Sequence, residues 1–366
     1  MSDLRPDCRP AVTRPPRRAR RPFASRGDHH SAPSQRAARP SGRSPLRPAV
    51  AVALSLAAAL ALSGCASMPP AVREYRAHLS YEPVLGQTMA YADAGPHDGQ
   101  VIVLTHGLPT SSYLYRNVIP GLAAKGFRVI APDFVGFGAS SKPEDEAAYA
   151  LPLQADRLLA LLDQLGVARF SLVVHDLGGL ISFELLDRAP QRVERLMVLD
   201  TTAYTEGFEP PREMRMLGGW MGGMMAASMR GALLGPWLTA SFVRDNVGRP
   251  ERVDQAAADL YWWSLHEGAV VPMRAVAGHF DAYLAQFPRY QQALRRFTGP
   301  AALLWGEGDR VLPFEKLGPQ FARDLRIPPE RVRAVKGAKH FLQEDAPEAV
   351  TEAILELMRE PAVAAR

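Results

Sequence analysis

An aspartate stands where the sequence predicts a tight turn from a strand into a helix. Asp176 lies in the segment VHDLGG, residues 174–179, after an apolar run and before a segment with helical spacing. Such a turn exposes a single side chain, and the N-terminus of the following helix favours the anionic form of a carboxyl group. A carboxylate can displace a leaving group at an sp³ carbon without a prior proton transfer, which produces an alkyl ester of the protein. Taken alone, Asp176 could equally be a helix N-cap.

A second carboxylate and a histidine follow Asp176 in the sequence. Hydrolysis of such an ester needs both groups. Asp309 lies in the loop WGEGDRVLP, residues 305–313, and His340 lies in the loop after the last predicted strand. The histidine would activate the attacking water, and the carboxylate would orient the imidazole. The chain order of nucleophile, acid and histidine supports these roles. Glu307 and Asp200, which lies at the end of the strand predicted at 195–199, are the competing carboxylates.

Two backbone N–H groups are predicted to hold the oxyanion that forms during ester hydrolysis. One belongs to Leu108, in the sharp turn after His106 and Gly107, and the other belongs to Leu177, directly after the nucleophile. Both leucines also make the predicted pocket apolar.

Catalysis by a serine or a cysteine nucleophile is not predicted for this chain. The sequence contains no G-x-S-x-G motif, which argues against a serine esterase or lipase. The two cysteines, Cys8 and Cys65, both precede the predicted folded domain, so neither a catalytic thiol nor a thiolate metal site is expected. The chemistry of Asp176 requires no metal and no organic cofactor, and neither is predicted.

The elements that must position these residues alternate along the chain as strand, loop and helix. Apolar or alternating runs predict strands at 87–95, 101–104, 128–132, 170–175, 195–199, 301–305 and 332–335. Segments with helical spacing lie at 151–165, 177–188 and 347–358. This alternation predicts an α/β protein with a mostly parallel eight-stranded sheet flanked by helices on both faces.

One segment interrupts the alternation. Residues 201–297 contain four of the five tryptophans and show helical spacing without strand runs. We predict a helical cap here, inserted after the sixth strand. The core then consists of residues 76–200 and 298–366.

Charge and hydropathy separate the first 64 residues from the rest. Residues 1–64 contain twelve Arg, no Lys and three Asp, a net charge of +9, which leaves −4 of the total of +5 for the remainder. A nucleic-acid partner is therefore not predicted, because a basic footprint should lie on the folded domain. Residues 1–48 have the composition of a disordered leader, and the apolar run at 49–63 has the length of a signal-peptide core.

The end of this run, LSGC at residues 62–65, resembles a bacterial lipobox. The resemblance implies cleavage before Cys65, lipidation of its thiol and a lipidated tether at 65–75. We therefore expect an exported protein that acyl chains hold on a bacterial membrane. Ala66 after the cysteine favours the periplasmic face of the outer membrane.

Three longer motifs carry a family resemblance that covers nearly all of residues 75–360. They are HGLPTSSYLYRN at 106–117, PDFVGFG at 132–138 with Ser140, and HFLQED at 340–345. Together with VHDLGG they resemble the haloalkane dehalogenase and epoxide hydrolase branch of the α/β-hydrolase superfamily. The resemblance implies the α/β-hydrolase fold, an aspartate nucleophile and a small apolar electrophile as substrate.

The residues expected to stabilise the leaving group depart from the dehalogenase pattern. Dehalogenases usually have a Trp after the nucleophile and often an Asn after the His-Gly pair, where this chain has Leu177 and Leu108. A tryptophan of the cap could replace the missing donor: Trp220, Trp237, Trp262 or Trp263. An epoxide hydrolase would instead need a cap tyrosine as acid, from Tyr204, Tyr261, Tyr283 and Tyr290, of which Tyr261 and Tyr283 are favoured.

Three functions therefore stay open at the level of sequence. Haloalkane dehalogenation fits the motifs, whereas epoxide hydrolysis fits the missing halide donors. The third is a non-catalytic lipoprotein that keeps the fold for binding, since fold does not imply function.

Overall fold

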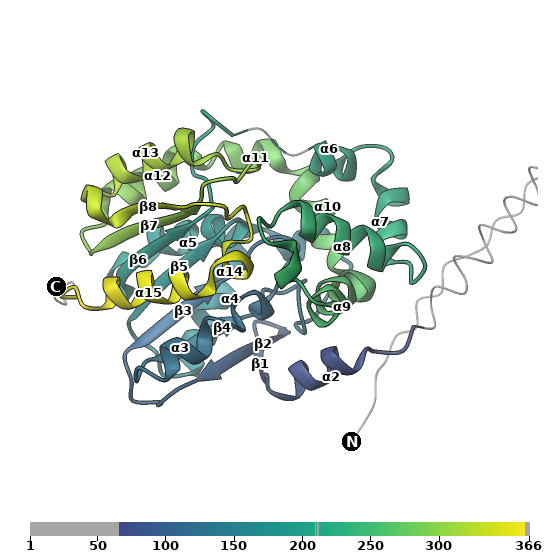
Figure 1. Cartoon of the computed structure of the whole chain (residues 1–366), viewed down its shortest axis with the longest axis horizontal. Helices are drawn as coiled ribbons and strands as arrows, with labels where there is room; N and C mark the ends of the chain where they lie inside the picture. Colours follow the sequence, from purple (N-terminus) through teal and green to yellow (C-terminus); the bar gives the residue numbers. More distant parts are fainter. Residues whose placement is uncertain (1–65, 209, 211, 363–366) are drawn as a thin grey trace, which may run out of the picture. The chain divides into compact units, whose positions relative to one another are not determined.

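The strands form where the sequence has continuous apolar runs. The computed structural model describes residues 66–362, apart from residues 209 and 211, and contains one eight-stranded sheet (Figure 1). In the third strand, β3 (Val101–Thr105), Val103 packs into the core on one face, whereas Ile102 and Leu104 pack into the core on the other. Strands buried on both faces favour apolar side chains at successive positions, which explains the apolar runs.

The sheet confirms the predicted fold class. Its strand order is β1-β2-β4-β3-β5-β6-β7-β8; the β1–β2 and β2–β4 pairs are antiparallel, and every later pair is parallel. Besides β3, the strands are β1 (Ser80–Val84), β2 (Gln87–Ala94), β4 (Arg128–Pro132), β5 (Phe170–His175), β6 (Val193–Leu199), β7 (Ala301–Gly306) and β8 (Val332–Val335). The first of these, β1, is a short strand at one edge of the sheet, and the sequence pattern did not predict it.

Two layers of helices cover the sheet (Figure 1). One face carries α4 (Leu151–Gln164), α5 (Leu177–Arg188), α12 (Phe287–Arg296) and α13 (Phe314–Asp324). The other carries α3 (Ile119–Ala123) and α15 (Pro347–Met358), with the short α14 (Leu342–Asp345) before it. Short 3-10 turns η2, η3, η4, η5 and η7 lie at Ser112–Tyr115, Glu146–Tyr149, Pro190–Arg192, Pro250–Arg252 and Pro329–Arg331.

A group of helices between β6 and β7 forms the cap, to the right of the sheet in Figure 1. It contains α6 (Arg212–Gly218), α7 (Gly222–Arg230), α8 (Gly235–Asp245), α9 (Gln255–Ser264), the π-helix η6 (Leu265–Ala269), α10 (Val270–Gly278) and α11 (Phe280–Leu284). The predicted cap range of 201–297 also includes α12, which packs on α5 of the core. There the hydroxyl of Tyr290 donates to Glu184 at 2.9 Å.

The segment after the predicted lipidation site contains a helix. Residues 70–77 form α2 (Pro70–Ala77), which packs against α9 of the cap. Val72 is buried beside Trp262 and Trp263, and the Arg76 guanidinium pairs with Glu267 at 2.5 Å. An apolar contact and an ion pair therefore hold the predicted tether on the domain.

The leader, the signal-peptide core and Cys65 lie outside the described residues. None of the helices that the structure describes is both long and apolar enough to cross a membrane.

Candidate active site

Asp176 lies at the end of β5, in a backbone conformation that few non-glycine residues adopt. Its φ of 49° and ψ of −126° form the tight turn into α5. Neighbouring glycines make this turn possible, because a Cβ atom at Gly107 would overlap the Asp176 carboxyl group and one at Gly179 would overlap the Thr201 hydroxyl. Such strain persists where the surrounding structure holds it in place.

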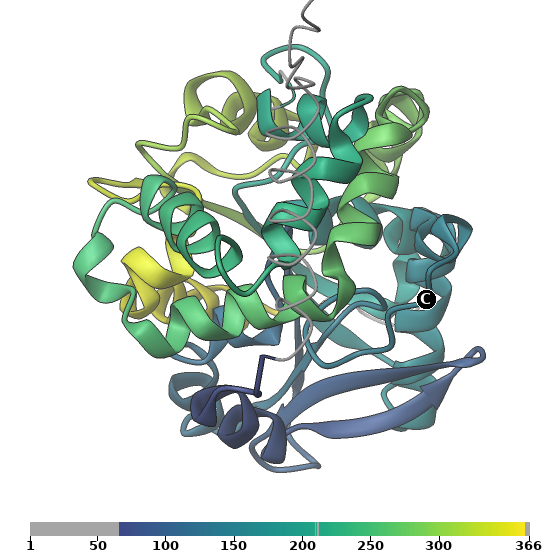
Figure 2. The same cartoon turned by 90° about the vertical axis from the view of Figure 1, so that its right-hand side faces the viewer.

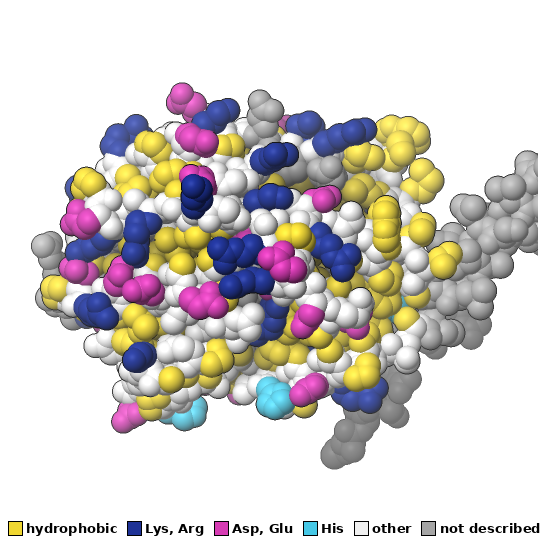
Figure 3. All heavy atoms as spheres, in the orientation of Figure 1, with side chains coloured by type: hydrophobic (Ala, Val, Ile, Leu, Met, Phe, Trp, Pro, Cys, Tyr) yellow, Lys and Arg dark blue, Asp and Glu magenta, His cyan; other side chains and the backbone are white. Residues whose placement is uncertain are grey.

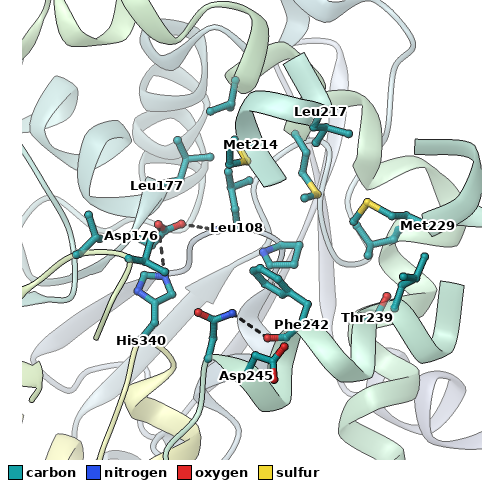
Figure 4. A pocket seen from close by; sticks show the side chains of 18 of the residues that line it. Leu108, Asp176, Leu177, Met214, Leu217, Met229, Thr239, Phe242, Asp245 and His340 are labelled. Carbon is teal, nitrogen blue, oxygen red and sulfur yellow. Dashed lines mark hydrogen bonds and ion pairs between the residues drawn. The ribbon is translucent and has the colours of Figure 1, made fainter. Parts of the chain in front are cut away.

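The three residues predicted to act together come together at the carboxyl ends of their strands, and Figure 4 shows Asp176 beside His340. Nε2 of His340 lies 3.6 Å from Oδ2 of Asp176, and Nδ1 of His340 lies 2.9 Å from Oδ2 of Asp309. The other oxygen of Asp309 accepts the backbone N–H groups of Val311 at 2.8 Å and Leu312 at 3.0 Å. These bonds orient the carboxylate toward the histidine.

The pKa values of this group follow from its charges. Burial by itself would lower the pKa of His340, but the carboxylates of Asp309 and Asp176 outweigh burial and hold that pKa well above its usual value. Burial would raise the pKa of Asp176, but the contact with His340 outweighs it and lowers the pKa to about 2. The resting site therefore holds an Asp176 carboxylate beside a His340 imidazolium.

Asp200, the alternative acid, lies beside Asp309 and not on the histidine. Its Oδ1 accepts the backbone N–H of Gly306 at 2.9 Å, and its own carbonyl accepts the N–H of Asp176 at 3.0 Å. Burial, followed by the charge of Asp309, raises the pKa of Asp200 well above its usual range. Asp309, and not Asp200, bonds Nδ1 of His340, so Asp309 fits the role of acid. The other competitor, Glu307, lies exposed in the same loop.

The two predicted oxyanion donors flank the nucleophile. The N–H of Leu108 donates to Oδ1 of Asp176 at 2.6 Å, and Leu177 is the first residue of α5. The Leu108 donor is thus already directed at the carboxyl group on which negative charge would build.

A cavity of about 1020 Å³ opens in front of Asp176 and His340. Its wall is mostly apolar, with Leu108 and Leu177 on the core side. On the cap side it includes Met214, Leu217, Met229 and Phe242, which Figure 4 shows facing Asp176 across the cavity.

Some of the aromatic candidates of the cap line the cavity, and others lie away from it. The favoured Tyr261 does not line the cavity; its buried hydroxyl donates to Glu344, so this assignment as a cap acid is wrong. Within the described residues, Tyr283 is the tyrosine that lines the cavity. Trp237 is the lining tryptophan there, whereas Trp262 and Trp263 pack against α2.

The remaining aromatic candidates also lie elsewhere. Trp220 is exposed, and Tyr204 and Tyr290 are buried with their hydroxyls donating to Asp324 and Glu184.

Sequence reasoning missed the residues that hold the histidine loop in place. The Nε2 atom of His175 lies 2.9 Å from the carbonyl oxygen of His340, and burial lowers the pKa of His175 to about 4, so the neutral ring can donate this bond. Asp345 accepts the backbone N–H groups of Gly248, Arg249 and Lys339, each at 2.8 Å. His175 lies in the motif VHDLGG and Asp345 lies in HFLQED. A motif alone does not show which of its polar residues have a structural role.

No group of three side chains able to hold a metal ion occurs in the part of the chain that the structure describes.

Residues 100–347 match the family described as alpha/beta hydrolase fold. The chain is 32% identical to a cis-3-alkyl-4-alkyloxetan-2-one decarboxylase from Xanthomonas campestris over 74% of this chain and 91% of that protein. It is also 30% identical to a haloalkane dehalogenase from Mycobacterium marinum over 73% and 87% of the two chains.

Solved structures agree with these matches. A loop variant of a haloalkane dehalogenase from Bradyrhizobium elkanii superposes with a TM-score of 0.59 at 26% identity, covering 76% of this chain and 95% of that one. An epoxide hydrolase superposes with a TM-score of 0.61 at 24% identity, covering 76% and 98%, which shows a likeness of fold alone. This chain belongs to the α/β-hydrolase fold family, in which its relatives include haloalkane dehalogenases.

Proposed function

We propose that the protein hydrolyses an apolar alkyl electrophile through a covalent ester of Asp176, as a dehalogenase-type enzyme. The observation that supports this most directly is the Asp176–His340–Asp309 arrangement at the base of an apolar cavity. A non-catalytic binding protein would have no need for a strained aspartate with its pKa lowered to about 2 beside a buried histidine.

In the first step an oxygen of Asp176 attacks an sp³ carbon of the substrate. The new C–O bond forms as the carbon–halogen bond breaks, and the halide leaves with the bonding electrons. No proton moves, because the nucleophile is already ionised.

In the second step water attacks Cγ of the ester and gives a proton to Nε2 of His340. The N–H groups of Leu108 and Leu177 hold the resulting oxyanion, and Asp309 stabilises the imidazolium. Collapse releases the alcohol, which takes up this proton from His340. The carboxylic acid left on Asp176 then passes its own proton to the freed Nε2 of His340, which restores the carboxylate. Because ester formation removes the charge of Asp176, it also removes one cause of the raised His340 pKa and frees this ring to act as base.

The cavity indicates the kind of substrate. About 1020 Å³ is at the upper end of ligand pockets, which span about 300–1,000 Å³. An electrophile that carries a long or branched alkyl chain fits this volume better than a small haloalkane does. The decarboxylase relative, whose name specifies two alkyl substituents on a strained ring, is consistent with such a substrate.

The test is a substrate panel with the form that starts after Cys65. Long-chain haloalkanes, long-chain epoxides and a dialkyl oxetanone are incubated separately, and halide, diol and carbon dioxide are assayed beside Asp176→Ala. Halide release that is lost in the variant supports the proposal. Turnover that survives in Asp176→Ala contradicts it.

Epoxide hydrolysis is the second candidate, favoured by the phenol of Tyr283 in the cavity wall and by the leucines at 108 and 177. A phenol could protonate the opening oxygen. Tyr283→Phe would then abolish diol formation and spare halide release, whereas Tyr261→Phe, whose hydroxyl bonds Glu344, would serve as the matched control.

The membrane anchor rests on the sequence LSGC at residues 62–65. We propose that the protein is exported and lipidated at Cys65, with the periplasmic face of the outer membrane as its expected location. Mass spectrometry of the cell-derived N-terminal peptide, compared with Cys65→Ser, tests this assignment. An unmodified Cys65 thiol, or a start upstream of it, would rule it out.

A further inference from the structure

The cap carries a group of exposed apolar side chains. Nine large hydrophobic residues are exposed in the described part of the chain, and seven lie between residues 216 and 237. These seven form what we call the cap patch: Met216, Trp220, Met221, Met224, Leu233, Leu234 and Trp237. Trp220 is 92% exposed, Leu233 75% and Trp237 68%. We propose that the cap patch docks on the surface of an anionic lipid bilayer.

The patch residues gather on one side of the molecule. They belong to α6, α7, α8 and the connections between them, and α7 packs against both α6 and α8. Figure 3 shows hydrophobic side chains along the right-hand margin, where α7 and α8 lie in Figure 1, and Figure 2 turns this side toward the viewer. Exposed apolar side chains that gather in this way mark interaction sites on soluble proteins.

Charge favours a lipid surface as the occupant of the patch. Arg215, Arg230 and Arg244 are exposed around the patch, and residues 214–244 contain no Asp or Glu. Basic residues that border apolar ones suit anionic headgroups above acyl chains, and tryptophan is enriched at that depth.

The start of the described chain lies next to the patch. Ala66, which follows Cys65, packs in the same small cluster as Trp262, Trp263 and Ala232. Ala232 directly precedes Leu233 of the patch. Acyl chains on Cys65 would therefore enter a bilayer beside the patch, so one membrane can hold both.

The patch also borders the mouth of the cavity. Leu234 and Trp237 belong to the patch and line the cavity that contains Asp176. On a bilayer the cavity would open toward the acyl chains, and an apolar substrate dissolved there would reach the nucleophile without crossing water. This last step rests on the proposed function, whereas the docking does not.

The test uses the form that starts after Cys65, so that no lipid is attached. This form contains all eight strands, both helix layers and the cap, and solved relatives of this extent are matched over 95% or more of their length. Sedimentation with vesicles of phosphatidylethanolamine and phosphatidylglycerol measures the partition coefficient. Trp220→Ser combined with Leu233→Ser should weaken it at least about tenfold, because two large apolar side chains lose their burial.

Leu85→Ser is the matched control, since Leu85 is 56% exposed on the β1–β2 turn, outside the patch. It should bind as the unaltered protein does. Tryptophan emission should shift to the blue on binding, because Trp220 and Trp237 are exposed, whereas Trp262, Trp263 and Trp305 are already buried.

Three results would overturn the proposal: no vesicle binding, equal binding by both variants, or a patch-dependent dimer in sedimentation velocity that does not bind vesicles. None of these outcomes depends on turnover, so the docking can fail while the proposed function stands.

Discussion

Nε2 of His340 lies 3.6 Å from Oδ2 of Asp176, and the two groups shift each other's pKa in opposite directions. The carboxylate contributes to the raised pKa of the imidazole, and the imidazole lowers the pKa of the carboxyl group to about 2. This contact thus helps to keep the nucleophile ionised before the reaction and, together with the charge of Asp309, favours the protonated form of the imidazole.

Replacing the base should trap the intermediate. His340→Gln leaves the attack by Asp176 possible but removes the acceptor for the proton of water, so ester hydrolysis should slow by about 10²–10⁴-fold. Peptide mass spectrometry after incubation with a substrate should show an alkyl adduct on Asp176. An adduct on any other residue would contradict the assignment of the nucleophile.

The two buried carboxyl groups near the histidine should differ in importance. Asp309→Asn removes the charge that supports the imidazolium and should lower kcat by about 10²–10⁴-fold. Asp200→Asn should change kcat little, because Asp200 accepts the backbone N–H of Gly306 and Nδ1 of His340 bonds Asp309 instead. Steady-state kinetics of the two variants provide the comparison, and the reverse ranking would move the role of acid to Asp200.

The two chemical steps should respond differently to pH. Attack by Asp176 should stay constant on acidification to about pH 4, because its pKa is about 2. Ester hydrolysis should slow as pH falls, because Asp309 keeps the pKa of His340 raised and protonation removes the base. Rapid-quench measurement of the ester and of the final product separates the steps. In Asp176→Asn the imidazole pKa, followed by NMR, should fall.

The turnover rate should depend on the free space beside the Asp176 carboxyl group as well as on the charge of that group. Gly107→Ala places a methyl group against the Asp176 carboxyl group, and the resulting displacement should lower kcat by about 10²-fold. Gly223→Ala, with nothing near its added methyl group in α7, should instead stabilise the fold by about 0.4–1 kcal/mol. Kinetics and thermal unfolding of both variants check this, and unchanged turnover in Gly107→Ala would contradict it.

The sequence by itself predicted seven of the eight strands, because a strand buried on both faces favours a run of apolar residues. It also placed Asp176, Asp309 and His340 in loops after strands, where the carboxyl ends of parallel strands meet. Whether Asp309 or Asp200 bonds the histidine depended on which carboxyl oxygen faces Nδ1, a distance that no local pattern contains.

Only the tertiary structure decided the roles of the cap residues. Tyr261 and Tyr283 have similar surroundings in the sequence, but one bonds Glu344 of the core and the other lines the cavity. Likewise α2 packs on the domain through Val72, which is buried beside Trp262 and Trp263 although these lie nearly two hundred positions later in the sequence. Such contacts depend on how the cap packs on the core. The residues that meet there lie far apart in the sequence, so no local sequence pattern predicts their contact.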